Sequence, residues 1–313
     1  MEKVILKNIY NEDVYLQIVD NENDADFITH SGTFHADEVM STVILLNKFK
    51  EVKLFRTNNV NKEDAFIYDI GFGKYDHHAS DFDEKRDNGI KYASCGLIWK
   101  EFGKEIVKDL NINDAEQFFD NVDKNIIMDL DSDDNGQSLD VKLSIKIQNI
   151  SSLISNFNPN WDDLSNENEC FINAVCFANT IFNNIISKMK ASYKAKSIVE
   201  EKIEESKDGI LILDNYMPWK EIVLASSNPK AKDILYAIFP SKRGGYNVVA
   251  TPKESGSFEQ RKSFPSNWAG KENEELQEIS GVETITFCHK GLFICACKTY
   301  EDALKIADIA IKN

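Results

Sequence analysis

The sequence has few of the residues that support several common kinds of site. It contains only 5 histidines, and none of its 6 cysteines forms a Cys-x-x-Cys pair. That cysteine pattern argues against a structural zinc site or a disulfide framework and fits a reducing compartment. Lys and Arg number 36 against 52 Asp and Glu, so the formal net charge is -16 at pH 7. A protein that holds long nucleic acid by many phosphates is normally basic, so such binding is not expected.

Long apolar runs and targeting features are also missing. No segment is expected to be long and apolar enough to span a bilayer. The first residues are acidic and rich in asparagine, which is unlike a signal or transit peptide. Hydrophobic residues make up 42% of the 313 residues, an ordinary share for a globular protein with room for two domains. We therefore expect a cytoplasmic location and no membrane partner.

Four of the five histidines lie in one short segment, residues 27–78, and each lies near a carboxylate. The segment contains the runs THSGTFHADE at residues 29–38, DIG at residues 69–71 and DHH at residues 76–78. Imidazole nitrogens mixed with carboxylate oxygens, without thiolates, suit manganese or a similar divalent ion. Because a lone histidine is usually structural, it is the clustering that favours a metal site.

Apolar runs predict where these side chains lie in the fold. Residues 25–29 and 65–70 are predicted to be buried strands, with a helix at residues 37–49 between them. This order predicts a parallel α/β sheet, and ligands bind such sheets at the carboxyl ends of the strands. Asp69 lies near the end of the second run. A carboxylate there is costly unless it binds a cation, so Asp69 is the candidate to bridge two metals that act on a phosphoryl group.

These blocks, in this order, resemble the Myg exonuclease family, named after a melanocyte-proliferating gene, a branch of the DHH phosphoesterase superfamily. The resemblance continues through residues 94–99, 131–136, 218–220, 264–270 and 280–282, and so covers nearly all of the chain after the first two dozen residues. It implies a metal-dependent phosphodiesterase, a hydrolase involved in RNA processing. The expected activity is that of a 3'-5' exonuclease on RNA or short single-stranded oligonucleotides, with two divalent ions, Mn²⁺ by preference, as cofactors.

The resemblance also implies roles for individual residues. The ligands of one metal would be His30, His35 and Asp69. The ligands of the other would be Asp37, Asp69, His77 and Asp134. Asp131 stays open as the alternative to Asp134, because spacing alone does not separate them. His78 would contact the scissile phosphate, which makes His78, Asp69 and His77 the expected catalytic residues. Many superfamily members have aspartate where His35 stands, so the first site is expected to be softer.

The fold class expected is α/β, with a DHH-like parallel-sheet domain and a smaller α+β domain. We place the metal-binding catalytic domain at residues 1–190, a connector helix at residues 191–207 and the substrate-binding domain at residues 208–313. Strands are predicted in the last domain at residues 209–214, 222–226, 235–239 and 246–251, with a hairpin at 285–298 and a helix at 300–311. At the other end, residues 14–18 alternate and are expected to form an edge strand, while the role of residues 1–24 is otherwise open.

Four residues of the second domain are candidate substrate contacts. Arg261 and Lys262 form a compact basic pair, Lys220 follows a tryptophan, and Trp268 could stack on a base. Because solvated charge and core aromatics explain such residues equally well, the assignment is a hypothesis for each.

Other functions stay open at this point. A pyrophosphatase or a cyclic-dinucleotide hydrolase could use the same metal core, and a non-catalytic metal-stabilised binding module is a further alternative. The intact ligand set argues against the last of these. RNA, DNA and small phosphate substrates are not separated by the sequence, and neither is a monomer from a homodimer.

Overall fold

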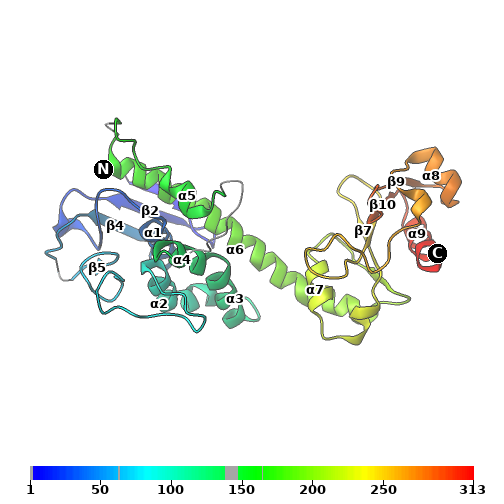
Figure 1. Cartoon of the computed structure of the whole chain (residues 1–313), viewed down its shortest axis with the longest axis horizontal. Helices are drawn as coiled ribbons and strands as arrows, with labels where there is room; N and C mark the ends of the chain where they lie inside the picture. The colour runs from blue at the N-terminus through cyan, green and yellow to red at the C-terminus, as the bar shows by residue number, and fades with distance from the viewer. Residues whose placement is uncertain (1–2, 63, 138–146, 164) are drawn as a thin grey trace. The chain divides into compact units, whose positions relative to one another are not determined.

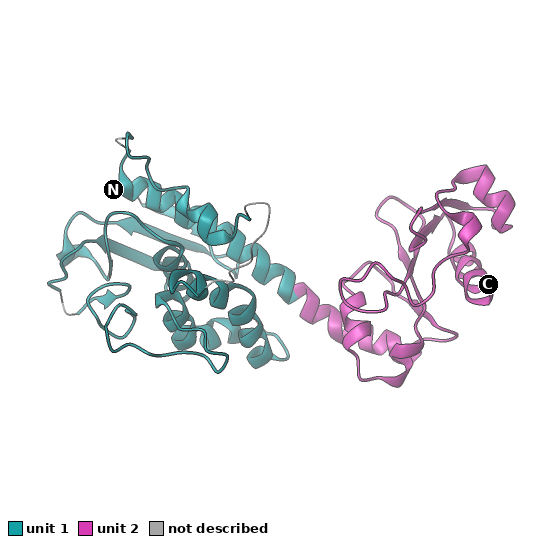
Figure 2. Cartoon of the chain, in the orientation of Figure 1, with its two compact units in different colours: residues 1–190 teal, residues 191–313 magenta. Residues whose placement is uncertain are grey.

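A single helix of 39 residues, α6 (Glu167–Glu205), contains the boundary between two compact units of the chain. The computed structural model describes residues 3–62, 64–137, 147–163 and 165–313. Unit 1 comprises residues 1–190 and unit 2 residues 191–313 (Figure 2). The catalytic and substrate-binding roles expected of the two units stay predictions.

Unit 1 is built on a five-stranded sheet of order β1-β2-β4-β3-β5. Its strands are β1 (Val4–Lys7), β2 (Asp13–Ile18), β3 (Phe27–Thr29), β4 (Glu51–Arg56) and β5 (Phe66–Ile67). All neighbouring pairs are parallel except β1 and β2, so the sheet is mixed rather than purely parallel. The prediction of an edge strand at residues 14–18 is wrong, because β2 lies between β1 and β4 and every second residue of it is buried.

Helices of unit 1 surround a central helix, α1 (Ala36–Lys48). Its residues from Ala36 to Asn47 are all buried, which explains why its sequence is apolar on nearly every side. The other helical segments are α2 (Ser94–Lys108), α3 (Ala115–Val122), a π-helical turn (Asp123–Ile127), α4 (Met128–Asp134) and α5 (Ile150–Ser155). Contacts of α1 with α2, α4, α5 and the strands β2 and β4 make it the centre of this unit (Figure 1).

Unit 2 contains a second mixed sheet, of order β6-β7-β8-β10-β9. Its strands are β6 (Ile210–Ile212), β7 (Tyr236–Pro240), β8 (Tyr246–Ala250), β9 (Ile285–Cys288) and β10 (Ile294–Cys297). Only β6 and β7 are parallel, and the remaining pairs are antiparallel. Besides residues 191–205 of α6, its α-helices are α7 (Lys220–Ala225), α8 (Asn273–Ser280) and α9 (Tyr300–Lys312).

The strand predicted at residues 222–226 is wrong, because this segment belongs to α7. Its run of Ile222, Val223 and Leu224 reads as a buried strand, yet only Val223 is fully buried there. The Val223 amide donates to the Trp219 carbonyl, and both side chains belong to the same apolar cluster. The short helix thus places one residue per turn against the core, which a strand would not do.

The expectation that no segment could span a membrane needs correction for α6. This helix contains an 18-residue window of mean hydropathy 1.3 with few charges, and 44% of that window is buried inside the protein. Phe171, Val175 and Phe182 of α6 are buried completely. One such helix is weak evidence for a membrane span, since a core helix has the same length and composition.

Candidate metal centre

The turn between β3 and α1 brings two histidines together. His30 follows β3, and His35 precedes α1 in an extended conformation as its N-cap. The Glu38 carboxylate accepts the His35 backbone N–H at 3.0 Å, and its Oε1 lies 2.8 Å from His30 Nε2. The ligand atoms of His30, His35 and Glu38 all lie within 4.8 Å of one another, so these residues could hold a metal ion.

Asp69 lies next to His30 of this turn, although in the chain it comes two residues after the short strand β5. Its backbone has φ 57°, a left-handed conformation that is rare for a residue with a side chain, and only 4% of its surface is exposed. Asp69 Oδ2 lies 3.3 Å from His30 Nε2, and Oδ1 lies 3.6 Å from His77 Nδ1. The two oxygens of one carboxylate thus face histidines from two different segments, which is the arrangement that a bridging ligand requires.

A second group lies on the other side of Asp69. Asp37, in the first turn of α1, is 1% exposed, and its carboxylate accepts the backbone N–H groups of Ser94 and Cys95 at 2.9 and 2.6 Å. His77 Nε2 lies 2.9 Å from Asp134 Oδ2. Ligand atoms of Asp37, His77 and Asp134 lie within 4.8 Å of one another, so this group could also hold an ion.

The structure gives Asp131 and Asp134 different surroundings. Asp131 is completely buried, its Oδ2 lies 2.7 Å from Arg86 Nη2, and its Oδ1 accepts the Gly96 backbone N–H at 3.0 Å. A Cβ on Gly96 would overlap the Asp131 carboxylate, so only glycine fits there. Because a cation already pairs with Asp131, Asp134 beside His77 is the better placed of the two alternatives.

Electrostatics in this region favour a cation. Burial, followed by the charges of Asp69, Asp134 and Asp131, raises the pKa of Asp37 well above its ordinary value. Burial alone would lower the pKa of His30, but its contacts with Asp69 and Glu38 outweigh that effect and raise the pKa to about 10.

His77 responds in the same way as His30. Burial opposes the charged imidazole, and the contacts with Asp134 and Asp69 nevertheless raise its pKa. Buried carboxylates that repel one another, with imidazoles between them, fit divalent ions by donor type and by charge.

His78 differs from the other histidines because more than half of its side chain, 55%, is exposed. Asp76 Oδ1 lies 2.7 Å from His78 Nδ1 and also accepts the His78 backbone N–H. Asp76 itself is 3% exposed and accepts the Phe72 N–H, so it is firmly held. The contact occupies Nδ1 and leaves the second imidazole nitrogen of this exposed side chain available for a phosphate.

A cavity of about 450 Å³ adjoins the second group. It is lined by His35, Asp37, Asp133 and Asp134 and by residues around α5. The latter include Asn149, Ser151 and Ser152, and the lining also contains the apolar residues Ala36 and Leu130. Its size is within the range of roughly 300–1,000 Å³ that small-molecule sites occupy.

Several residues of this centre were missed by the sequence interpretation. Glu38, Asp76, Ser94 and Arg86 each contact a candidate metal ligand or catalytic residue, yet none was named as a site residue. Glu38 had a readable signal, because an acidic residue three positions after an N-cap marks a capping box. Arg86 had none, since its partner Asp131 lies 45 positions further along the chain.

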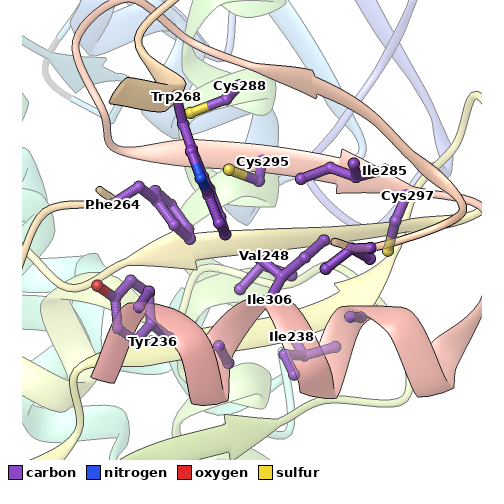
Figure 3. Packing of buried hydrophobic residues seen from close by; sticks show 14 of the residues in the cluster. Tyr236, Ile238, Val248, Phe264, Trp268, Ile285, Cys288, Cys295, Cys297 and Ile306 are labelled. Carbon is purple, nitrogen blue, oxygen red and sulfur yellow. The ribbon is translucent and has the colours of Figure 1, made fainter. Parts of the chain in front are cut away.

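The four predicted substrate contacts of unit 2 have different surroundings in the structure. The prediction that Trp268 stacks on a base is wrong, because the residue is 2% exposed and its ring lies in the core beside Phe264 and Cys288 (Figure 3). Arg261 Nη1 donates to the carbonyls of Ala231, Lys232 and Ile234. Lys262 Nζ donates to the carbonyl of Ile311. Both cations therefore hold the fold together, whereas Lys220 is exposed.

The described residues define a mixed α/β protein whose first unit gathers histidine and carboxylate groups that could hold a metal ion. The MYG1 exonuclease family model, described as "Uncharacterised protein family (UPF0160)", matches residues 26–311. The chain belongs to this family, which confirms the resemblance seen in its motifs.

Relatives match over almost the whole chain. The MYG1 protein of Dictyostelium discoideum is 33% identical, covering 91% of this chain and 96% of that protein. The MYG1 protein of Saccharomyces cerevisiae is 31% identical, covering 90% and 94%. The human protein, which bears the name MYG1 exonuclease, is 26% identical, covering 89% and 84%.

Proposed function

We propose that this chain is a divalent-metal-dependent phosphodiesterase of the DHH superfamily that removes nucleotides from the 3' end of RNA or short single-stranded oligonucleotides. The observation that carries the proposal is the Asp69 carboxylate, whose two oxygens face His30 and His77. The name exonuclease, borne by the human and rat relatives, supports the same class of reaction.

Two divalent ions, with Mn²⁺ as the preferred metal, are the proposed cofactors. The first would be held by His30, His35 and Asp69, with Glu38 as an added carboxylate. The second would be held by Asp37, Asp69, His77 and Asp134. Bound ions would supply Lewis-acid stabilisation of the charge that develops on the phosphoryl group.

Residues of the chain would perform the remaining tasks. Backbone N–H groups of Ser94 and Cys95 fix Asp37, and Ser94 Oγ donates to Asp69 Oδ1 at 3.2 Å. The carboxylates are thus oriented before any ligand arrives, which reduces the reorganisation needed during reaction. His78, held by Asp76, is proposed to contact the scissile phosphate from the solvent side.

The charge distribution bears on how substrate is held. Residues 1–190 contain 34 Asp and Glu against 19 Lys and Arg, so unit 1 should repel nucleic acid at long range. We therefore propose that only a short end of the substrate binds there, with the ions supplying local positive charge. A cytoplasmic location belongs to the same proposal.

The test compares substrates on one preparation. Protein stripped with a chelator and reloaded with Mn²⁺ is offered RNA and DNA ladders, pyrophosphate and a cyclic dinucleotide. With RNA labelled at the 5' end, a 3'-5' exonuclease should produce a descending ladder that requires metal. Hydrolysis of pyrophosphate or the cyclic dinucleotide alone would instead favour the alternative phosphohydrolase functions.

A matched pair of variants ties any activity to the site. Asp69→Asn should abolish it, whereas Asp64→Asn, whose side chain is 85% exposed, should not change it. Activity that survives the chelator or the Asp69→Asn change would refute the proposed mechanism.

A further inference from the structure

The acidic character of the protein is concentrated in one of its units. Residues 191–313 contain 17 Lys and Arg against 18 Asp and Glu, so unit 2 is nearly neutral although the whole chain carries -16. An anionic ligand is therefore repelled far less by unit 2 than by unit 1. Where cations of unit 2 gather without acidic partners, an anion can be bound.

Such a place exists beside α7. A cavity of about 680 Å³ is lined by the segment from Tyr216 to Glu221, by the ends of β7 and β8, and by Phe293 and Ile294. Every lining residue belongs to unit 2, so the cavity is complete within it. Its volume suits a small molecule.

One wall of the cavity is aromatic. Tyr216 is 60% exposed, and its ring centroid lies 5.4 Å from that of Phe239, which is buried below it. Trp219 is also buried and lines the same cavity. A large exposed ring backed by buried rings offers a planar ligand a surface on which to stack.

Cations also line the cavity. Lys220, Lys242 and Arg243 all line the cavity and are exposed. Among the residues that the structure describes, none of the three has a carboxylate partner within ion-pair distance, and Lys220 Nζ lies 6.0 Å above the Trp219 ring. Glu221 is the one carboxylate of the described lining, so the lining keeps an excess of positive charge.

Backbone geometry defines the turn that carries two of these cations. Lys242 and Arg243 lie in the turn between β7 and β8, where the Ser241 N–H donates to the Gly245 carbonyl at 2.9 Å and the Gly244 N–H donates back to Ser241 at 3.0 Å. Gly245 has φ 70°, and a Cβ there would overlap the Cys297 carbonyl oxygen. The turn therefore packs closely against β10, which sets the backbone position of both cations.

Asn247 of β8 supplies a further polar group. It lines the cavity, and its side-chain amide has no hydrogen-bond partner among the described residues. An amide has both donors and an acceptor, which matches the polar edge of a nucleobase.

From these three features we infer that the cavity of unit 2 binds one nucleotide. The base of the nucleotide would stack on the Tyr216 ring and form hydrogen bonds with the Asn247 amide. The phosphate would pair with Lys242 and Arg243. Arg and Lys are the usual partners of phosphate oxygens. This inference deepens the proposed function. It rests on that function in one respect, namely that the bound nucleotide comes from a single-stranded oligonucleotide.

Binding can be measured without any turnover. The full-length protein, kept in a chelator so that no metal is bound, is titrated calorimetrically with AMP, adenosine, inorganic phosphate and tetra-adenylate. AMP should bind more tightly than adenosine or phosphate alone, because only AMP fills both halves of the cavity. Tetra-adenylate should compete with AMP if the site binds one nucleotide of an oligonucleotide. If tetra-adenylate does not displace AMP, the oligonucleotide is not the source of the bound nucleotide.

Variants separate the two halves of the cavity. Lys242→Gln with Arg243→Gln should weaken AMP about tenfold while leaving adenosine unchanged. Tyr216→Ala should weaken AMP and adenosine by a similar factor and leave phosphate unchanged. The control is Lys232→Gln with Lys312→Gln, which removes the same charge at exposed positions outside the cavity and should leave AMP affinity as in the unmodified protein.

Three results would overturn the inference. They are an absence of AMP binding, equal losses in the control and in the variant that changes Lys242 and Arg243, and displacement of AMP by hexaglutamate at the same concentration as by AMP itself. Failure of the nuclease assay would leave the AMP measurement untouched, and loss of AMP binding in an active nuclease would refute the cavity alone. The two proposals are thus tested separately.

Discussion

Replacing Arg86 by Met should destabilise unit 1 more than any surface change. The Arg86 side chain is 7% exposed and binds Asp123 through two hydrogen bonds of 2.7 and 2.6 Å. Its Nη2 also lies 2.7 Å from Asp131, whose side chain is completely buried. The variant leaves that buried carboxylate without a cation, which typically costs about 3–5 kcal/mol of unfolding free energy.

The assay is urea unfolding of metal-free protein, followed by fluorescence. A slope of about 2–3 kcal/mol per M turns this loss into a midpoint shift of roughly 1–2.5 M. Because the chain has two units, the shift should appear only in the transition of unit 1, to which the buried Trp99 belongs. The unit 2 transition provides an internal reference.

Two further variants decide whether the pair is the cause. Lys85→Met removes the neighbouring cation, which pairs with an exposed carboxylate, and should change stability by less than about 0.5 kcal/mol. Adding Asp131→Asn to Arg86→Met should recover part of the loss, because a neutral amide can still accept the Gly96 N–H. A loss below about 1 kcal/mol for Arg86→Met, or no recovery in the double variant, would refute the reasoning.

Three other outcomes are expected. Asp69→Ala should lower the Mn²⁺ bound per chain in equilibrium dialysis more than any other single ligand change, because its two oxygens face two histidines. Gly245→Ala should lower the denaturation midpoint of unit 2 well below that of Gly244→Ala: both glycines have positive φ, but only the first would overlap the Cys297 carbonyl. Trp268→Ala should lower the unfolding free energy of unit 2 by about 3–5 kcal/mol in urea unfolding. It should leave the AMP affinity of the folded protein unchanged, and a weakened affinity would instead support the predicted contact of Trp268 with substrate.

The metal-site candidates could be predicted from sequence because they follow strands and begin a helix. His30 follows β3, His35 caps α1, and Asp69 comes after β5, so a parallel arrangement alone brings them to the same edge of the sheet. The strand predicted at residues 65–70 was too long, because the left-handed backbone of Asp69 is incompatible with a strand. The chain leaves the sheet after Ile67 and turns through a left-handed residue, which no propensity scale anticipates.

Choosing between Asp131 and Asp134 required tertiary structure. Both lie in one acidic run, and a helix places them one turn apart, so spacing gives no preference. In the structure Arg86 pairs with Asp131, and this pairing, which depends on how residues 81–92 fold against α4, is the reason for proposing Asp134 as the ligand. A sequence shows that charge is present, and only the fold shows which charge is already compensated.

The prediction that Trp268 contacts substrate failed because its burial, too, depends on tertiary structure. A tryptophan in a loop that contains proline and glycine reads as an exposed ring, but the short helical turn at Ser266–Trp268 directs it into the core of unit 2. Lys242 and Arg243, by contrast, gave no motif at all. They become a candidate site only through the turn that sets them beside Tyr216, far away in the sequence.

The strand pair at the beginning of the chain affects how a shortened protein would behave. The family match starts at residue 26, yet β1 and β2 both lie before it, the second ending at Ile18, and they provide two of the five strands in the first sheet. A chain that starts at residue 26 would uncover the hydrogen-bonding edge of β4 and the apolar neighbours of Val14, Leu16 and Ile18. Open strand edges beside apolar surface pair with other chains. Trimming to the limits of sequence similarity would therefore turn a folded enzyme candidate into an aggregating one.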